Sequence, residues 1–141
     1  REDDRDRPRP DERLLWRSAP KEKTETWLGP VRWNLDVATS GTDGDVVVKI
    51  LDEDEKGVRR LVRWDVMRLR YRDSFERPTA MTPGRSERVR FETPDVAHAF
   101  LPGHRVVIQA QGSLFPLIDR NAGAFIDLYR ANPDEYVPHT V

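Results

Sequence analysis

The sequence predicts an all-β fold, a β-sandwich of the jelly-roll type with little helix. Apolar and polar residues alternate along several short segments, and glycine or proline turn signals separate these segments at spacings of roughly ten residues. No segment places apolar residues at helical spacing over three turns. At 141 residues the chain is long enough to bury one core, so we expect a single sandwich domain.

The first predicted strands comprise two weak candidates and one clear one. Residues 14–16 and 24–28 are short candidates, whereas residues 31–39 alternate clearly between apolar and polar side chains. Successive side chains of a strand point to opposite faces, so one face of residues 31–39 is predicted to lie in the core. That face holds Val31, Trp33, Leu35 and Val37.

Two further strands are predicted in the middle of the chain. Residues 46–50 repeat the alternation, with a core face formed by Val46, Val48 and Ile50. In residues 61–71 the apolar positions change parity, from Val62, Trp64 and Val66 to Met67, Leu69 and Tyr71. This switch predicts a β-bulge near Val66 and Met67, and it assigns Trp64 to the core.

The last predicted strands cover residues 89–91 and 106–110, each close to a Pro-Gly turn signal. Residues 95–101 are the best helical candidate, but Pro94 and Pro102 bracket them, so little helix is expected.

The ends of the domain follow from composition. Residues 1–13 are charged and interrupted by prolines, which predicts a flexible linker, and residues 14–141 are predicted to form the sandwich.

Charge and composition exclude several classes of partner. The 24 Lys and Arg residues nearly balance the 25 Asp and Glu residues, so no net field draws the chain toward nucleic acid or an anionic membrane. The longest apolar runs are far shorter than the roughly 20 residues of a membrane-spanning helix. With no cysteine, the sequence predicts neither disulfides nor a thiolate, and it fits a cytoplasmic or an exported protein equally well.

The chain lacks the residue patterns of a catalytic or metal site. A serine nucleophile on a sharp turn commonly lies in G-x-S-x-G, and neither Ser40-Gly41 nor Gly112-Ser113 matches that pattern. The three histidines, His98, His104 and His139, do not follow a zinc-ligand spacing. We therefore expect no catalytic residue, no metal and no cofactor in this chain.

Two acidic clusters and four tryptophans are the remaining candidates for ligand binding. Residues 43–45 and 52–55 are rich in carboxylates; either cluster could attract calcium, but the favoured interpretation is a solvated turn. Trp33 and Trp64 lie in register with aliphatic strand residues, which leaves Trp16 and Trp27 as candidate surface aromatics for a ligand.

Several polar and aromatic residues are candidates for structural locks. Phe115-Pro116 leads into the trio Asp119-Arg120-Asn121, which favours a loop fixed by hydrogen bonds and a left-handed turn at Asn121. His98 and His104 flank a turn and are predicted to act as structural hydrogen-bonding groups. The full set of candidates is His98, Phe100, His104, Phe115, Asp119, Arg120 and Asn121.

Seven stretches, taken in order, resemble one known family. They are GPVRWNL at 29–35, TSGTDGD at 39–45, VVKILD at 47–52, VMRLRYR at 66–72, DVAHAF at 95–100, GHRV at 103–106 and FPLIDRN at 115–121. The order is similar to that of the C-terminal domain shared by X-Pro dipeptidyl-peptidases, cocaine esterase, α-amino acid ester hydrolases and glutaryl cephalosporin acylases. The stretch 68–76 resembles the ester hydrolase and acylase branch most closely.

The resemblance implies a galactose-binding-like jelly roll that packs beside an α/β-hydrolase domain of the same parent chain. It implies that the serine hydrolase triad lies in that other domain and that this chain alone is inactive. The lock candidates would then fix the jelly roll or contact the hydrolase domain, and residues 1–13 would be what remains of the interdomain connection. A start at Arg1 rather than Met fits a processed product or a cloned fragment.

The sequence departs from the family pattern at two places. Ile118 stands where relatives usually carry an aromatic residue, and the chain ends at Val141 where relatives continue into a last strand. A missing strand would leave one sheet edge unprotected, so the sequence also predicts a homo-oligomer through a sheet edge. The alternative function is a carbohydrate-binding jelly-roll module that uses Trp16 or Trp27.

Overall fold

The computed structural model describes residues 13–141, and its regular structure is almost entirely β. Residues 1–12, and with them most of the predicted linker, lie outside the described residues. The strands are β1 (Arg13–Arg17), β2 (Glu25–Val37), β3 (Asp45–Glu53), β4 (Arg59–Arg68), β5 (Glu87–Phe100) and β6 (Arg105–Gln111). The helical turns of the described part are η3 (Leu69–Tyr71) and η4 (Pro133–Glu135).

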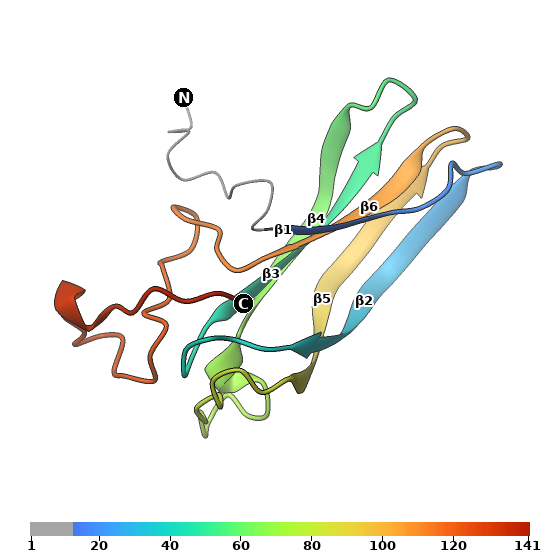
Figure 1. The fold of residues 1–141 in the computed structure, drawn as a ribbon. Coiled ribbons are helices and arrows are strands. Elements are labelled where there is room, and N and C mark those ends of the chain that lie inside the picture. Colours follow the sequence, from blue (N-terminus) through green and yellow to red (C-terminus); the bar gives the residue numbers. More distant parts are fainter. Residues whose placement is uncertain (1–12) are drawn as a thin grey trace.

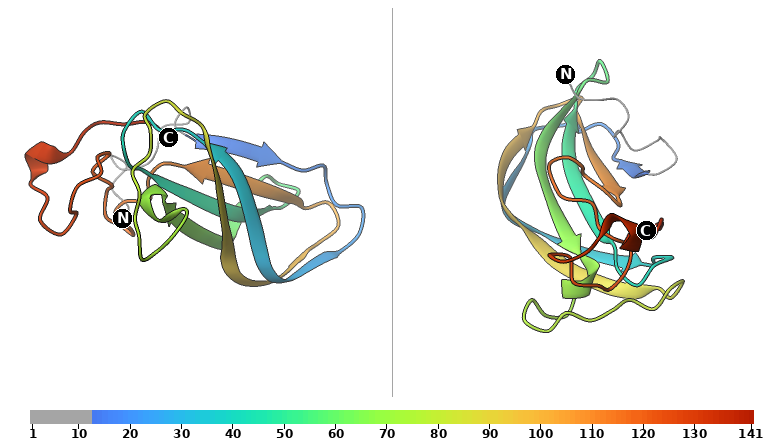
Figure 2. Two further views of the ribbon diagram at one scale, coloured as in Figure 1. Left: turned by 90° about the horizontal axis from the view of Figure 1, so that it is seen from below. Right: turned by 90° about the vertical axis from the view of Figure 1, so that its left-hand side faces the viewer.

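The strands form two antiparallel sheets that face each other across one core (Figure 1). One sheet has the order β1-β6-β3-β4, and the other pairs β2 with β5. The chain passes repeatedly from one sheet to the other, and both sheets curve around the core in the views of Figure 2. The predicted all-β sandwich with little helix is confirmed.

The core lies between the two sheets, and aromatic residues of the two-stranded sheet fill much of it. Trp33 of β2 stacks on Phe91 of β5 with ring centroids 6.3 Å apart. Trp27 and the fully buried Phe100 form a T-shaped pair with ring centroids 5.2 Å apart. The predicted core residues on these strands therefore point inward, as their alternation required. The buried cluster comprises Trp33, Val37, Val46, Val48, Ile50, Met67, Leu69, Met81, Val89, Val96, Phe100 and Val106.

The weak strand candidate at 24–28 and the clear one at 31–39 belong to one strand, β2. Their junction is irregular, because Gly29 pairs with Val96 while Val31 pairs with Thr93. Pro30 and Pro94 fall in this gap in the register. Proline has no backbone N–H, and neither position needs one to hydrogen-bond to the paired strand. The stretch that follows Pro94 continues as part of β5.

The bulge predicted near Val66 and Met67 is wrong in position. Pairing between β3 and β4 is continuous there and breaks only between Ile50–Arg63 and Leu51–Leu61, so Val62 is the extra residue.

Trp64 is also misassigned by the sequence pattern, for a related reason. It pairs with Lys49 on the outer face of the four-stranded sheet and remains 36% exposed. Val66, on the same outer face, pairs with Val47, which is fully buried. The parity switch thus reflects a strand that carries apolar residues on both faces.

The central strand β3 has buried carboxylates at both ends. Asp43 and Asp45 lie at its beginning, and Asp52 and Glu53 lie at its end; all four are buried. The favoured interpretation as a solvated turn is therefore wrong for residues 43–45, because a buried charge must be paired to be tolerated. In the second cluster it holds only for Asp54 and Glu55, which lie in the turn after β3.

Arg70 neutralises Asp43 and attaches the C-terminal segment to β3. Its Nε donates to Asp43 Oδ2 at 2.6 Å, and its backbone N–H donates to Asp43 Oδ1 at 3.1 Å. The same guanidinium donates from Nη1 to the carbonyl of Ile126 at 2.8 Å and lies over the ring of Phe125. A single buried arginine therefore joins η3, the start of β3 and residues 124–126.

Arg68 does the same for Asp45 with a two-pronged contact. Its Nε and Nη2 donate to the two carboxylate oxygens at 2.9 and 3.2 Å. The side-chain amide of Asn121 donates to Asp45 Oδ1 at 2.9 Å. The hydrogen bond to Asp45 raises the pKa of the Arg68 guanidinium, which favours its charged form.

Replacing Arg70 with Met is predicted to lower the free energy of unfolding by about 3–5 kcal/mol, because the Asp43 carboxylate would remain buried without its partner. Arg130→Met is the matched control, since the Arg130 side chain is 88% exposed. That control should change stability by about 0.5 kcal/mol or less. Urea unfolding followed by tryptophan fluorescence measures both, and equal losses in the two variants would contradict the assignment.

Candidate interdomain surface

Asp52, near the end of β3, holds two of the predicted lock residues. His98 Nε2 of β5 and His104 Nδ1 of the β5–β6 turn each lie 2.8 Å from one of its carboxylate oxygens. An ionised carboxylate only accepts, so both ring nitrogens carry hydrogen. Asp52 therefore connects the four-stranded sheet to β5 of the other sheet.

The His98 ring continues into an aromatic group that includes Trp27. His98 meets the edge of Phe100 at a centroid separation of 4.7 Å, and Phe100 in turn contacts Trp27. The Trp27 indole donates to Glu25 Oε1 at 2.7 Å and packs against the core cluster. Of the two candidate surface aromatics, Trp27 is thus partly buried, whereas Trp16 is 57% exposed.

Glu53 is buried at the same end of β3 between two arginines. Arg59 Nε donates to its Oε2 at 2.7 Å, and the guanidinium of Arg17 pairs with its Oε1. The hydrogen bond from Arg59, with a smaller contribution from Arg17, lowers the pKa of Glu53, although burial partly opposes the shift.

The lock residues that follow β6 do not act as one unit. Asn121 is buried, and its side chain also accepts the Gly123 amide at 2.9 Å. Asp119 is exposed and contributes its backbone carbonyl to Arg68 Nη2 at 3.4 Å. The Arg120 guanidinium lies 4.5 Å from the ring centroid of Phe115. No described residue other than glycine has a positive φ, so the left-handed turn expected at Asn121 is absent.

Sequence reasoning missed Arg68 and Arg70, which the structure places at the centre of this network. One signal was available: Asp43 and Asp45 are two residues apart, as are the two arginines, so two pairs of opposite charge share one spacing.

The histidine contacts contain no nucleophile. Within residues 13–141, the ring nitrogens of His98 and His104 contact Asp52, and His139 Nδ1 lies 3.2 Å from the Val137 carbonyl. No serine hydroxyl of that range hydrogen-bonds to a histidine ring, so a serine–histidine pair is not assembled there. The same residues hold no group of three potential metal ligands and no helix long and apolar enough to cross a membrane.

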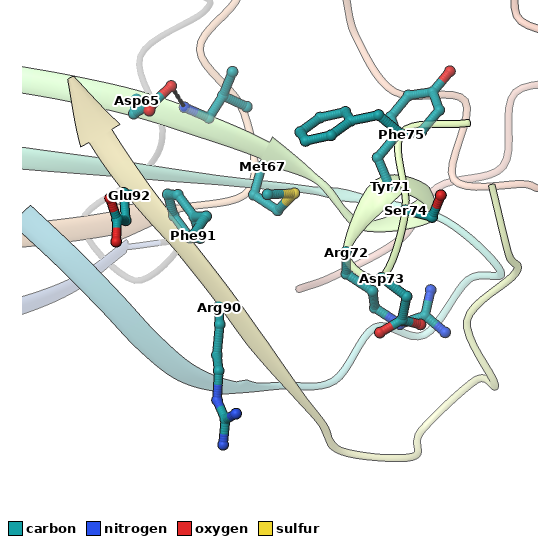
Figure 3. Close-up of a pocket in the computed structure, with 11 residues that line it drawn as sticks. Asp65, Met67, Tyr71, Arg72, Asp73, Ser74, Phe75, Arg90, Phe91 and Glu92 are labelled. Carbon is teal, nitrogen blue, oxygen red and sulfur yellow. Dashed lines mark hydrogen bonds and ion pairs between the residues drawn. The ribbon is translucent and has the colours of Figure 1, made fainter. Parts of the chain in front are cut away.

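A hollow of about 460 Å³ opens between β4 and β5. Figure 3 shows its walls, which come from residues 65–67, 71–75 and 90–92. Tyr71 and Phe75 stack with centroids 6.0 Å apart at one end, and Phe75 is 77% exposed. The Arg90 side chain points away from these rings (Figure 3), so the hollow combines this aromatic pair with a polar lining.

Residues 112–141 form an irregular segment that extends from the same end of the sandwich (Figure 1). Besides its contacts to Arg68 and Arg70, the segment is held where the Phe125 amide donates to Thr42 Oγ1 at 2.8 Å. Near its end, the Ser40 amide donates to the Thr140 carbonyl at 3.0 Å. Between these anchors Tyr129 is fully exposed, and Leu117 before them is 72% exposed.

The pKa of Glu53 predicts how stability depends on pH. This pKa is lower in the folded than in the unfolded chain, so the unfolded chain binds more protons in mild acid. The stabilisation from Glu53 is complete above about pH 4.3 and is lost as the pH falls through the lower folded value. Glu53→Gln should flatten this part of the profile in urea unfolding across pH, with the exposed Glu76→Gln as the control; identical profiles would contradict it.

Comparisons with known proteins agree with this geometry. A family model, the X-Pro dipeptidyl-peptidase C-terminal non-catalytic domain, matches residues 4–125. Cocaine esterase from Rhodococcus sp. (strain MB1 Bresler) is 33% identical over 94 residues, which cover 67% of this chain and 16% of that enzyme.

Two solved structures are similar over nearly the whole chain. An aminopeptidase from a marine sediment Thaumarchaeota archaeon superposes with a TM-score of 0.86 at 34% identity, over 92% of this chain and 23% of that one. A selenomethionine-labelled α-amino acid ester hydrolase gives a TM-score of 0.85 at 33% identity, over 93% and 23%. The chain spans less than a quarter of each of these relatives. It belongs to the family of X-Pro dipeptidyl-peptidase C-terminal non-catalytic domains.

Proposed function

We propose that this chain is the accessory domain of a serine hydrolase and packs against an α/β-hydrolase catalytic domain of its parent polypeptide. In this proposal residues 14–141 make up the accessory domain and residues 1–13 connect it to the catalytic domain. The observation that carries the proposal is the surface formed by residues 112–141 and the neighbouring Phe75. This surface combines firm attachment with exposed aromatic and aliphatic side chains.

The attachment of residues 112–141 is stronger than a passive tail needs. Buried charges at Arg70 and Asp45 bind its first half, and backbone hydrogen bonds to Ala122 and Ser40 bind its end. Ordering a loop costs conformational entropy, which contacts must offset. Aromatic rings that stay in water add little hydrophobic stabilisation to an ordered loop unless a partner covers them.

The exposed side chains of this surface are of the kind that protein interfaces bury. Tyr129, Tyr136, Phe125 and Leu117 project from the segment, and Phe75 lies on the loop beside η3. Aromatic residues are enriched in interface cores because they bury a large area with few rotatable bonds. We infer that this surface supports or borders the catalytic domain, while specificity resides in residues outside this chain.

The predicted lock residues fit the proposal in two ways. Asp52, the partner of both histidines, lies at the opposite end of β3 from the exposed segment. The proposed role of His98, His104 and Phe100 is therefore to hold the two sheets together. Asn121 attaches the first part of the segment to Asp45 through its side-chain amide. Phe115 and Arg120 lie nearer the surface of the segment and are proposed to contact the catalytic domain.

A carbohydrate-binding function has weaker support. Of its two candidate aromatics, Trp27 is partly buried against the core cluster, and Trp16 is the more exposed of the two. The carboxylates of Asp43 and Asp45 bind arginines rather than facing solvent. The proposal of an accessory domain therefore accounts for more of the surface.

The proposal predicts that the chain binds the catalytic part of a related α-amino acid ester hydrolase that has been truncated before its own C-terminal domain. Calorimetry should detect a complex, and the complex should unfold at a higher temperature than the truncated enzyme. Tyr129→Arg should weaken binding by about tenfold or more, because hot-spot aromatics are worth about 2 kcal/mol or more. Leu28→Arg is the control, since Leu28 is also a large exposed hydrophobic residue, at 79% exposure, but lies on β2.

Two outcomes would contradict this function. One is turnover of an amino-acid ester by the chain alone, abolished by a serine-directed phosphonate, which would show that the chain carries its own nucleophile. The other is binding that both substitutions leave unchanged, or that only Leu28→Arg weakens, which would place the interface elsewhere.

A further inference from the structure

A carboxylate lies on the core-facing side of β4, at the edge of the sandwich. Asp65 pairs with Val48 of β3, which is fully buried in the core, and directly opposite residues of an antiparallel pair share a face. The buried Met67, two residues along, lies on the same face. Because β4 is the last strand of its sheet, Asp65 is only half-buried, and it lines the hollow between β4 and β5.

Within residues 13–141 this carboxylate has no cationic partner. Asp65 Oδ1 accepts the amide of Val66 at 2.8 Å, and no arginine, lysine or histidine of that range pairs with it. A carboxylate that is partly removed from water without a cation raises the free energy of the fold. The carboxylate therefore makes this end of the hollow complementary to a positive charge.

The arginines nearest to Asp65 are used elsewhere or point elsewhere. Arg72 donates from Nε to Glu87 at 2.7 Å, and its other nitrogens bind three backbone carbonyls. Arg90 also lines the hollow, but its side chain points away from the aromatic rings (Figure 3). Arg63, two residues before Asp65, lines a different hollow. A cation for Asp65 therefore has to come from outside the described chain.

Apolar side chains separate this carboxylate from the aromatic end of the hollow. Figure 3 shows Asp65 at one end and the stacked rings of Tyr71 and Phe75 at the other, with Met67 and Phe91 between them. A ligand that contacts both ends needs a long apolar stem and a cationic head. Arginine and lysine side chains have this form, and aromatic faces attract cations as well.

We propose that the hollow binds an arginine side chain of the catalytic domain, with its stem along Met67 and Phe91 and its guanidinium on Asp65. Arginine fits better than lysine because its planar head donates two parallel hydrogen bonds to a carboxylate and stacks on aromatic rings. The identity of the partner rests on the proposed function, whose surface includes Phe75. The preference for a cation rests on the hollow alone.

A small probe tests the hollow without the catalytic domain. N-acetylarginine amide should shift the NMR signals of Val66, Tyr71 and Phe75 in a saturable way, with a dissociation constant on the order of 1 mM. N-acetylcitrulline amide is the matched ligand, because it has the same length and no charge. It should bind about tenfold more weakly. Equal binding of the two probes, or shifts only at other residues, would overturn the proposal.

One substitution assigns the charge preference to Asp65. Asp65→Asn removes the charge but keeps a side-chain oxygen that can accept the Val66 amide, so the fold should be retained. It should weaken binding of the arginine probe about tenfold and remove the preference over citrulline. Glu22→Gln is the control, since Glu22 is exposed in the β1–β2 loop and does not line the hollow. A preference that survives in Asp65→Asn would contradict the assignment.

The same two variants separate this inference from the accessory function. In calorimetry with the truncated ester hydrolase, Asp65→Asn should raise the dissociation constant about tenfold, and Glu22→Gln should leave it unchanged. A complex that Asp65→Asn does not weaken would overturn the arginine contact while the accessory function stands. Absence of any complex would contradict the accessory function, and with it the partner named here, even where the probe binds.

Discussion

The fold depends on the four buried carboxylates at the ends of β3 and on the arginine and histidine side chains that pair with them. Arg70 and Arg68 meet Asp43 and Asp45 at one end, while His98, His104 and two arginines meet Asp52 and Glu53 at the other. Leaving any such carboxylate unpaired costs several kcal/mol, so each contact also fixes the segment that supplies the partner side chain. The central strand thereby positions η3, β5, the β5–β6 turn and residues 119–126.

This arrangement explains how a non-catalytic domain can hold an irregular surface in a defined place. Sheets bury side chains well, but residues 112–141 contain no strand and gain little from packing. Arg70 compensates because it binds the carbonyls of Ala124 and Ile126 as well as Asp43. The exposed aromatics thus lie on a rigid base, which reduces the entropy lost when a partner covers them.

Alternation predicted the sandwich because it depends only on which face of a strand is buried. It located β2, β3 and β6 and the core positions of Trp33, Val48 and Val106. It failed at Trp64, because β4 carries apolar residues on both faces and the parity of apolar residues then loses its meaning. The acidic cluster at 43–45 was misassigned for another reason: its partners, Arg68 and Arg70, lie more than 20 residues away, and pairing across such a distance is a property of the fold.

Hydrogen exchange of the unmodified chain tests the central claim most directly, namely that the buried ion pairs join residues 119–126 to β3. The amides of Gly123, Phe125 and Val137 all donate hydrogen bonds within this region. The account predicts that they are protected to nearly the same extent as the amides of β3 and lose protection with them as urea is added. Exchange at the rate of an unstructured chain, while β3 stays protected, would contradict it.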